Sequence, residues 1–260
     1  MTQFGPWTLE DDEPLAVLTI AKPPLNLFDD AVFEGVIDAI TAVGASPARG
    51  LLMRAEGKVW TGGVDVNMFQ GLTPDGGADV WRRGFELVQA IEDLPFPTIF
   101  AAHSLCLTWG FELALACDLI VAAEGAKFGL VEIVVGLTPS MGGPQRLAEK
   151  AGPSRAKDLV FTGELFDART LEAWGVVTRV WPDEEFEQRS RKLATRIANG
   201  PTRAHAATKR IVLEQKERGA RAADAITPQL SGDLFATEDL QNAVDSFLRE
   251  GPGKATYQGR

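Results

Sequence analysis

Two glutamates of this chain stand in sequence that is otherwise almost free of charge. Glu112 lies in the segment WGFELALACD (109–118), and Glu132 is the only charged residue between Lys127 and Arg146. A carboxyl group in apolar surroundings is either paired, and therefore structural, or has a raised pKa that suits proton transfer. Taken alone, Glu112 could equally be an exposed first-turn residue whose charge complements a helix dipole.

Two segments could supply backbone N–H groups beside these carboxyls. The segment WTGGVD (60–65) holds paired glycines, which let a backbone approach a ligand closely, although the same pattern also forms a plain tight turn. A helix is predicted to begin near Trp109, and the free N–H groups of a helix start stabilise a developing negative charge. The sequence therefore offers acid–base groups and donors for an anion.

Other sources of chemistry are missing from the sequence. It has no GxGxxG, GxxxxGK[ST] or GxSxG motif. Its two histidines, His103 and His205, have no partner at a metal-ligand spacing, so we expect no metal. His103 is followed by Ser104, but adjacent residues rarely face each other, so we interpret this histidine as structural. The chemistry must come from carboxylates and backbone donors.

The bulk composition excludes several classes of protein. The 260 residues are 45% hydrophobic and carry a formal charge of −10, which disfavours binding to nucleic acid or to an anionic membrane. Cys106 and Cys117 lie in apolar sequence and are expected to be reduced core residues. Residues 94–111 lack Asp, Glu, Lys and Arg, but two prolines, His103 and Ser104 interrupt them, so we reject a membrane span. No signal peptide pattern is visible in residues 1–13, so we expect a cytoplasmic protein.

The predicted elements alternate along the first two-thirds of the chain. Short branched runs predict buried strands, and apolar spacing of three and four predicts helices. The strands are expected at 15–20, 50–54, 98–102, 118–123 and 176–180, and the helices at 29–43, 80–94, 110–116, 155–161, 168–174, 183–199, 201–218 and 237–250. This order favours an α/β core over residues 1–182 with parallel strands. Residues 183–260 are expected to form a helical region that packs on a neighbouring subunit.

The ordered segments FELALACD (111–118), FGLVE (128–132) and GLTPSMGGPQRL (136–147) together resemble the crotonase (enoyl-CoA hydratase/isomerase) superfamily. The likeness runs from the strand at Leu15 to Arg260, nearly the whole chain. It implies a crotonase-like spiral of repeated β/α units followed by a C-terminal helical region. It also implies a homotrimer or a homohexamer.

The resemblance implies a role for each part of the site. The backbone N–H groups of Gly62 and Trp109 would form an oxyanion hole for a thioester enolate. Glu112 and Glu132 would hold one water between them, with Glu132 delivering a proton to the α-carbon. No cofactor is implied beyond the coenzyme A moiety of the acyl-CoA substrate. The resemblance places the contacts to coenzyme A and the candidates for the acyl pocket as follows: Lys22, Leu25, Leu27, Gly63, Val64 and Asp65 for coenzyme A, and Met68, Phe69, Trp81, Phe85 and Leu137 for the acyl chain.

The chain departs from the family pattern at several positions. His103-Ser104 stands where Asn-Gly is frequent, Thr108-Trp109-Gly110 replaces a glycine triplet, and Val131 replaces a proline. A backbone donor survives such a change, but the Trp109 indole must lie outside the pocket or narrow it. Asp118 and Arg146 match motif positions and are interpreted as structural.

The resemblance favours a 2-enoyl-CoA hydratase of fatty acid β-oxidation, because syn addition of water uses two acid–base groups on one face of the alkene. A Δ3,Δ2-enoyl-CoA isomerase, which needs one carboxylate, is the first alternative. A non-catalytic acyl-CoA binding protein of the same fold is the second, since a fold alone does not prove activity.

Overall fold

The computed structural model describes residues 1–260, with the side chain of Asp12 excepted. A seven-stranded sheet runs through the molecule in the order β1-β2-β3-β4-β5-β7-β10. Strands β3, β4, β5, β7 and β10 are parallel, and β1 and β2 add an antiparallel edge. The bounds of these strands are Thr2–Phe4, Trp7–Asp12, Leu15–Ile20, Gly50–Ala55, Thr98–Ala102, Leu119–Ala123 and Arg179–Trp181.

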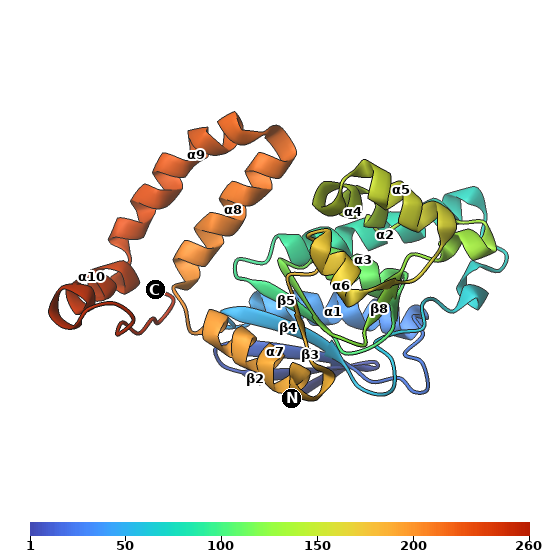
Figure 1. The fold of residues 1–260 in the computed structure, drawn as a ribbon, viewed down its shortest axis with the longest axis horizontal. Coiled ribbons are helices and arrows are strands. Elements are labelled where there is room, and N and C mark those ends of the chain that lie inside the picture. The colour runs from blue at the N-terminus through green and yellow to red at the C-terminus, as the bar shows by residue number, and fades with distance from the viewer.

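Both faces of the sheet are covered, as its apolar strands require. Helices α1, α2 and α3 bury one face and helix α7 the other (Figure 1). Strand β3 shows the division, because Ala16 and Leu18 join the larger core while Leu15 and Val17 pack in the core that α7 covers. The bounds of the helices in this part are Asp30–Ala45 (α1), Pro74–Glu92 (α2), Trp109–Ala116 (α3), Gly143–Ala151 (α4), Pro153–Thr162 (α5), Ala168–Ala173 (α6) and Asp183–Ala198 (α7).

A second, three-stranded sheet positions the loops that carry the candidate site. It comprises β6 (Cys106–Leu107), β8 (Lys127–Gly129) and β9 (Phe166–Asp167). Single bridges extend it: Thr61 pairs with Cys106, and Val64 pairs with Phe28. Two short 3-10 helices follow the site loops, η1 (Val66–Phe69) and η2 (Glu132–Val135).

The last three helices form an arm that projects from the core (Figure 1). It contains α8 (Thr202–Arg218), α9 (Ala220–Asp233), the 3-10 helix η3 (Leu234–Ala236) and α10 (Glu238–Glu250). Charged contacts join α8 to the core: Lys209 Nζ lies 2.9 Å from Asp118 Oδ2, and Lys216 Nζ lies 2.9 Å from Glu92 Oε1.

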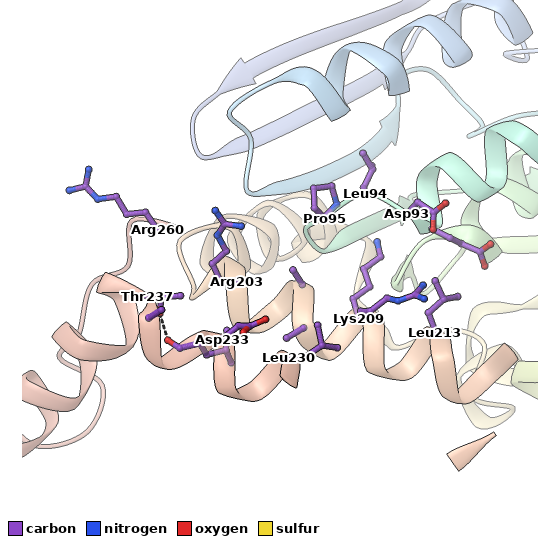
Figure 2. Close-up of a pocket in the computed structure, with 16 residues that line it drawn as sticks. Asp93, Leu94, Pro95, Arg203, Lys209, Leu213, Leu230, Asp233, Thr237 and Arg260 are labelled. Carbon is purple, nitrogen blue, oxygen red and sulfur yellow. Dashed lines mark hydrogen bonds between the residues drawn. The ribbon is translucent and has the colours of Figure 1, made fainter. Parts of the chain in front are cut away.

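A cavity of about 620 Å³ lies where the arm leaves the core. Side chains from α8 and α9 and the segment after α2 face it, among them Lys209, Leu230 and Pro95 (Figure 2). None of the predicted site residues lines it. This cavity therefore belongs to the junction of arm and core, not to the candidate site.

Most predicted strands and helices are confirmed, with four corrections. Helix α2 begins at Pro74 and not at 80, because Thr73 Oγ1 accepts the Gly76 N–H at 3.1 Å and proline suits a first turn. The last strand is Arg179–Trp181, since Val176 and Val177 lie in a turn whose N–H groups bond to Leu171 O. Helices α4 and α9 were not predicted, and α9 contains a proline and a glycine.

The fourth correction concerns the boundary of the helical region. Helix α7 was assigned to that region, but its Phe186, Leu193 and Ala194 pack directly on the sheet. The projecting part therefore starts near Pro201. Among the described residues, no helix is long and apolar enough to cross a membrane.

Candidate active site

Helix α3 carries Glu112 into the interior, and every residue of this helix is buried. A glycine at position 110 allows the close approach that this requires. A Cβ there would lie 2.4 Å from Thr61 Cγ2, a distance that no side chain tolerates. The start of α3 therefore rests directly on the loop 60–65, and Glu112 is fully buried, not an exposed first-turn residue.

The Glu112 carboxyl is held by one oxygen only. Its Oε1 accepts the N–H groups of Met141 and Gly143, both at 2.8 Å, whereas its Oε2 is buried with no partner among the described residues. A Cβ at position 143 would lie 2.9 Å from Oε1, so glycine is needed here. Burial raises the pKa of Glu112 to about 7, although the two N–H groups lower it.

Glu132 begins the short helix η2, and neither of its oxygens is bonded. Both are buried, and within the described part of the chain neither has a hydrogen-bond partner. Burial and then the charge of Glu112 raise the pKa of Glu132 to about 8. Because one carboxylate disturbs the other, the two groups share one site, and three of their four oxygens are free to contact a ligand.

The loop 60–65 presents a different donor from the one predicted. The Gly62 N–H donates to Leu25 O at 2.8 Å, so it is already engaged. The Gly63 N–H donates to Thr61 Oγ1 at 3.0 Å. Across the described residues, only the next N–H of this run, that of Val64, has no acceptor.

Strand geometry explains which N–H is free. Phe28 N donates to Gly63 O at 2.9 Å, and Asp65 N donates to Phe28 O at 2.8 Å. In a parallel bridge, the residue between these two bonds points its own N–H to the opposite side. Val64 therefore directs its N–H away from Phe28. The Gly62 N–H, which was expected to be the free donor of this loop, is engaged, and the N–H of Val64 is the candidate in its place.

The predicted role of Trp109 as a backbone donor stays a prediction. It is the first residue of α3, and no acceptor for its N–H exists among the described residues. The preceding residue, Thr108, has φ of +49°, a conformation that a β-branched side chain rarely adopts. The Thr108 hydroxyl is also buried with no partner in the described structure. Strain is thus concentrated at the start of the helix.

Asn26 supports the loop that carries the donors, a role the sequence did not predict. Its side-chain amide donates to Glu56 O at 2.8 Å, Val59 O at 3.0 Å and Trp60 O at 3.1 Å. The backbone carbonyl of Asn26 accepts a hydrogen bond from the Thr61 hydroxyl at 2.7 Å. Asn26 has φ of +49°, which asparagine tolerates better than most residues. An asparagine between two leucines is the one sequence signal of this brace.

The residues expected to contact coenzyme A lie together beside this loop. A Cβ at Gly62 would meet both Leu25 Cβ and Leu27 Cδ2 at 3.3 Å, so these leucines border the glycine pair. Lys22 donates to Leu27 O at 3.2 Å and forms an ion pair with Asp29. Asp65 caps η1 by accepting the N–H of Asn67 at 3.0 Å, which gives it a structural task.

The Trp109 indole lies in an aromatic cluster next to the site. It is 2% exposed, and two acyl-pocket candidates, Phe69 and Trp81, are among its neighbours. Phe85 lies 3.5 Å from the Cβ position of Gly142, and Leu137 N donates to Glu132 O. Met68 packs at the edge of the main core.

Several other residues singled out in the sequence have contacts within the protein. The buried Arg146 is bonded to Glu92 through two nitrogens, and Asp118 accepts the N–H and the hydroxyl of Thr98. His103 Nε2 contacts Gly57 O at 3.0 Å. Cys106 and Cys117 are buried free thiols. No group of three or more potential metal ligands occurs in the described residues.

Comparison with known proteins gives a single family. Residues 10–258 match the enoyl-CoA hydratase/isomerase family. The chain is 33% identical to a crotonyl-CoA hydratase of Syntrophomonas wolfei over 93% of its length and 94% of that protein. It is 28% identical to a probable enoyl-CoA hydratase of Bacillus subtilis, over 94% of this chain and 95% of that protein.

Solved structures agree with this result. The crystal structure of an enoyl-CoA hydratase from Geobacillus kaustophilus superposes with a TM-score of 0.93 at 25% identity, over 100% of this chain and 98% of that one. A putative enoyl-CoA hydratase from Streptomyces coelicolor gives 0.93 at 26% identity, over 100% and 96%. The chain belongs to the enoyl-CoA hydratase/isomerase family and has the crotonase fold, so both expectations are confirmed.

Proposed function

We propose that this chain is an enoyl-CoA hydratase that adds water across the 2,3 double bond of a 2-enoyl-CoA thioester. One observation carries the proposal: two buried carboxyls share a site, and three of their oxygens have no partner among the described residues. Hydration needs a base for the water and an acid for the α-carbon on the same side of the alkene. Two coupled carboxyls of different pKa supply both.

In this mechanism the N–H groups of Val64 and Trp109 bind the thioester oxygen. Their hydrogen bonds strengthen as the carbonyl becomes an enolate, which lowers the barrier. Lys22, Leu25 and Leu27 border the same loop and would contact the coenzyme A moiety.

The two carboxyls divide the proton transfers. Glu112, with a pKa of about 7, takes a proton from the water through its free Oε2 while the water oxygen bonds to the β-carbon. Glu132, with a pKa of about 8, holds its own proton more strongly and delivers it to the α-carbon. The product gains one hydroxyl and one hydrogen, and the pair exchanges a proton to return to its first state.

Hydration of crotonyl-CoA by the wild type and the Glu132→Gln variant tests this assignment. The loss of a general acid typically costs a factor of about 10² to 10⁴ in rate, and we expect a loss of that size. Glu164→Gln, which changes an exposed glutamate, is the matched control and should retain full turnover. Equal rates for wild type and Glu132→Gln would overturn the assignment.

Isomerisation of 3-enoyl-CoA to 2-enoyl-CoA is the second candidate, and one observation favours it. Glu132 has two unbonded oxygens, so this residue alone could carry a proton between two carbons of the substrate. Glu112→Ala separates the two functions. A hydratase loses activity on 2-enoyl thioesters in this variant, whereas an isomerase keeps its activity on 3-enoyl thioesters.

We also propose a cytoplasmic protein that assembles into a homotrimer or homohexamer, and the arm supports the assembly. Phe235, Phe247 and Leu248 are 71%, 58% and 77% exposed, and apolar groups of this kind usually pack against another chain. Sedimentation of the wild type and of Leu248→Asp tests this proposal. We expect a trimer or larger for the wild type and a smaller species for the variant.

A further inference from the structure

The side chain of Trp109 is packed from four directions. Its ring centroid lies 4.9 Å from that of Phe33 on α1 and 6.1 Å from that of Phe28 before α1. It lies 6.5 Å from that of Phe69 on η1 and 6.1 Å from that of Trp81 on α2. The indole therefore fills the space between the start of α3 and helix α2.

Helix α2 contacts the segment that holds Glu112. A Cβ at Gly84 would lie 2.6 Å from Met141 Cγ, so α2 touches the segment whose N–H groups hold Glu112. Trp81 is one turn before Gly84 on the same side of this helix. The contact between Trp81 and Trp109 therefore closes the region next to the two carboxyls.

The position of the donor fixes where the substrate chain begins. If the Trp109 N–H binds the thioester oxygen, the carbonyl carbon lies about one hydrogen bond beyond it, roughly 3–4 Å from that nitrogen. The β-carbon must then reach the carboxyls of Glu112 and Glu132. Phe69 and Trp81, which are acyl-pocket candidates, both neighbour the Trp109 indole. A chain that extends beyond the β-carbon toward these residues meets the two indoles.

We infer that Trp109 is a specificity-determining residue that restricts this site to 2-enoyl thioesters with short acyl chains. The inference rests on the proposed hydratase function. The family frequently has a glycine at this position, which leaves space for an acyl chain. In this protein the Trp109 indole occupies that space, so a longer acyl chain does not fit.

Core packing holds the Trp109 indole in one orientation. Phe28 is 0% exposed and Phe33 is 3% exposed, and the rings of both contact the Trp109 indole. Rotation of the indole would have to displace these core side chains, and cores this closely packed resist such shifts. The restriction is therefore a fixed wall and not a movable lid.

Chain-length profiles test the inference. We would measure kcat/KM for crotonyl-CoA, hex-2-enoyl-CoA and dec-2-enoyl-CoA with the wild type, Trp109→Phe and Trp109→Gly. All three proteins keep the backbone donor. A methylene group that is buried favourably raises kcat/KM by about fourfold, so an open pocket should favour longer chains.

The wild type should prefer crotonyl-CoA to dec-2-enoyl-CoA by at least about tenfold. Trp109→Gly should raise the ratio of decenoyl to crotonyl kcat/KM by about tenfold or more, and Trp109→Phe should raise it less. Phe111→Leu is the control, because Phe111 lies on the same helix but packs on Phe128. This control should keep the wild-type ratio even if it lowers the Tm.

Two results would overturn the inference: equal kcat/KM for the short and long substrates in the wild type, or an unchanged ratio in folded Trp109→Gly. Trp109→Phe, which retains an aromatic ring, decides the question if Trp109→Gly fails to fold. If the wild type hydrates none of the thioesters, the proposed function fails, but the wall is still tested by calorimetry. Butyryl-CoA should then bind the wild type more tightly than decanoyl-CoA, and Trp109→Phe should reduce that difference.

Discussion

The two carboxyls of the site differ in how firmly they are held. Glu112 lies within a regular helix, is fully buried, and has one oxygen fixed by the N–H groups of Met141 and Gly143. Glu132 lies on a single 3-10 turn, and neither of its oxygens has a partner in the described structure. This difference fits the proposed mechanism, in which the fixed Glu112 accepts a proton from the water and the unbonded Glu132 delivers a proton to the α-carbon.

The surroundings of the two groups follow the same division. Glu112 borders the core, where neighbouring glycines and N–H groups determine its place. The three residues after Glu132, Ile133, Val134 and Val135, are 47%, 79% and 52% exposed. The fixed carboxyl of Glu112 can hold a substrate in a defined position, while the less constrained carboxyl of Glu132 can transfer protons.

Glu112→Gln gives the largest expected effect. Glutamine keeps an oxygen for the N–H groups of Met141 and Gly143, so the fold should be retained, but it cannot accept a proton from water. Hydration of crotonyl-CoA should fall by a factor of about 10² to 10⁴, with little change in Tm. Full activity in a folded variant would show that Glu112 only supports the structure.

The pH dependence of stability should distinguish the second carboxyl. In an unfolded chain Glu132 titrates near 4.5, and in the folded protein its pKa is about 8. Between these values the folded state binds a proton that the unfolded state has released, so stability falls as the pH rises. Glu132→Gln lacks this loss, so its stability relative to the wild type should rise by about 5 kcal/mol between pH 4.5 and 8.

Denaturant unfolding at several pH values measures this gain. Glu164→Gln should show no comparable trend, since Glu164 is exposed. A difference between Glu132→Gln and the wild type that stays constant with pH would mean that Glu132 is not held in an environment that raises its pKa.

Gly143→Ala tests how tightly the first carboxyl is fixed. The new Cβ would lie 2.9 Å from Glu112 Oε1 and 3.0 Å from Leu130 Cδ1, so the glutamate must move. We expect a loss of about 1–3 kcal/mol in the free energy of unfolding, together with reduced turnover.

Gly232→Ala is the matched substitution, because nothing lies within 4 Å of the Cβ position at Gly232 in α9. It should leave turnover unchanged and raise stability slightly, since alanine favours a helix. If Gly143→Ala behaved like Gly232→Ala, the close fit around Glu112 would have no consequence.

Thr108→Gly should give the smallest effect and should be stabilising. The helix that fixes Glu112 begins after a threonine at positive φ with a buried, unpartnered hydroxyl, as far as the described residues show. Glycine removes both costs, so the free energy of unfolding should rise by about 1 kcal/mol. Thermal unfolding measures this change, and a lower Tm would show that packing of the threonine outweighs its strain.

Local sequence patterns predicted the core of the fold well. The branched runs at 15–20, 50–54 and 98–102 are buried strands, because such runs fit no other environment. Helix α9 escaped prediction, since Pro228 and Gly232 lie inside it and tertiary contacts outweigh their propensities. The first turns of α2 were not predicted either, because glycines there disfavour a helix.

The sequence predicted which kinds of residue form the candidate site, but not the hydrogen bonds that position them. Charges in apolar sequence drew attention to Glu112 and Glu132, but only the family resemblance assigned both of them to one site. The bonds from Met141 and Gly143 depend on how distant segments meet, which no local pattern contains. The choice between Gly62 and Val64 depends on which N–H already has an acceptor: that of Gly62 donates to Leu25 O, whereas that of Val64 has no acceptor among the described residues.

Glu112 and Glu132 are proposed to work as one unit. Turnover of crotonyl-CoA by the wild type, Glu112→Gln, Glu132→Gln and the double variant tests this proposal most directly. We expect each single substitution to remove most of the activity and the double variant to be no slower than the slower single one. If the losses multiplied in the double variant, the two carboxyls would act independently. Wild-type turnover in either single variant would show that this carboxyl is not needed for hydration.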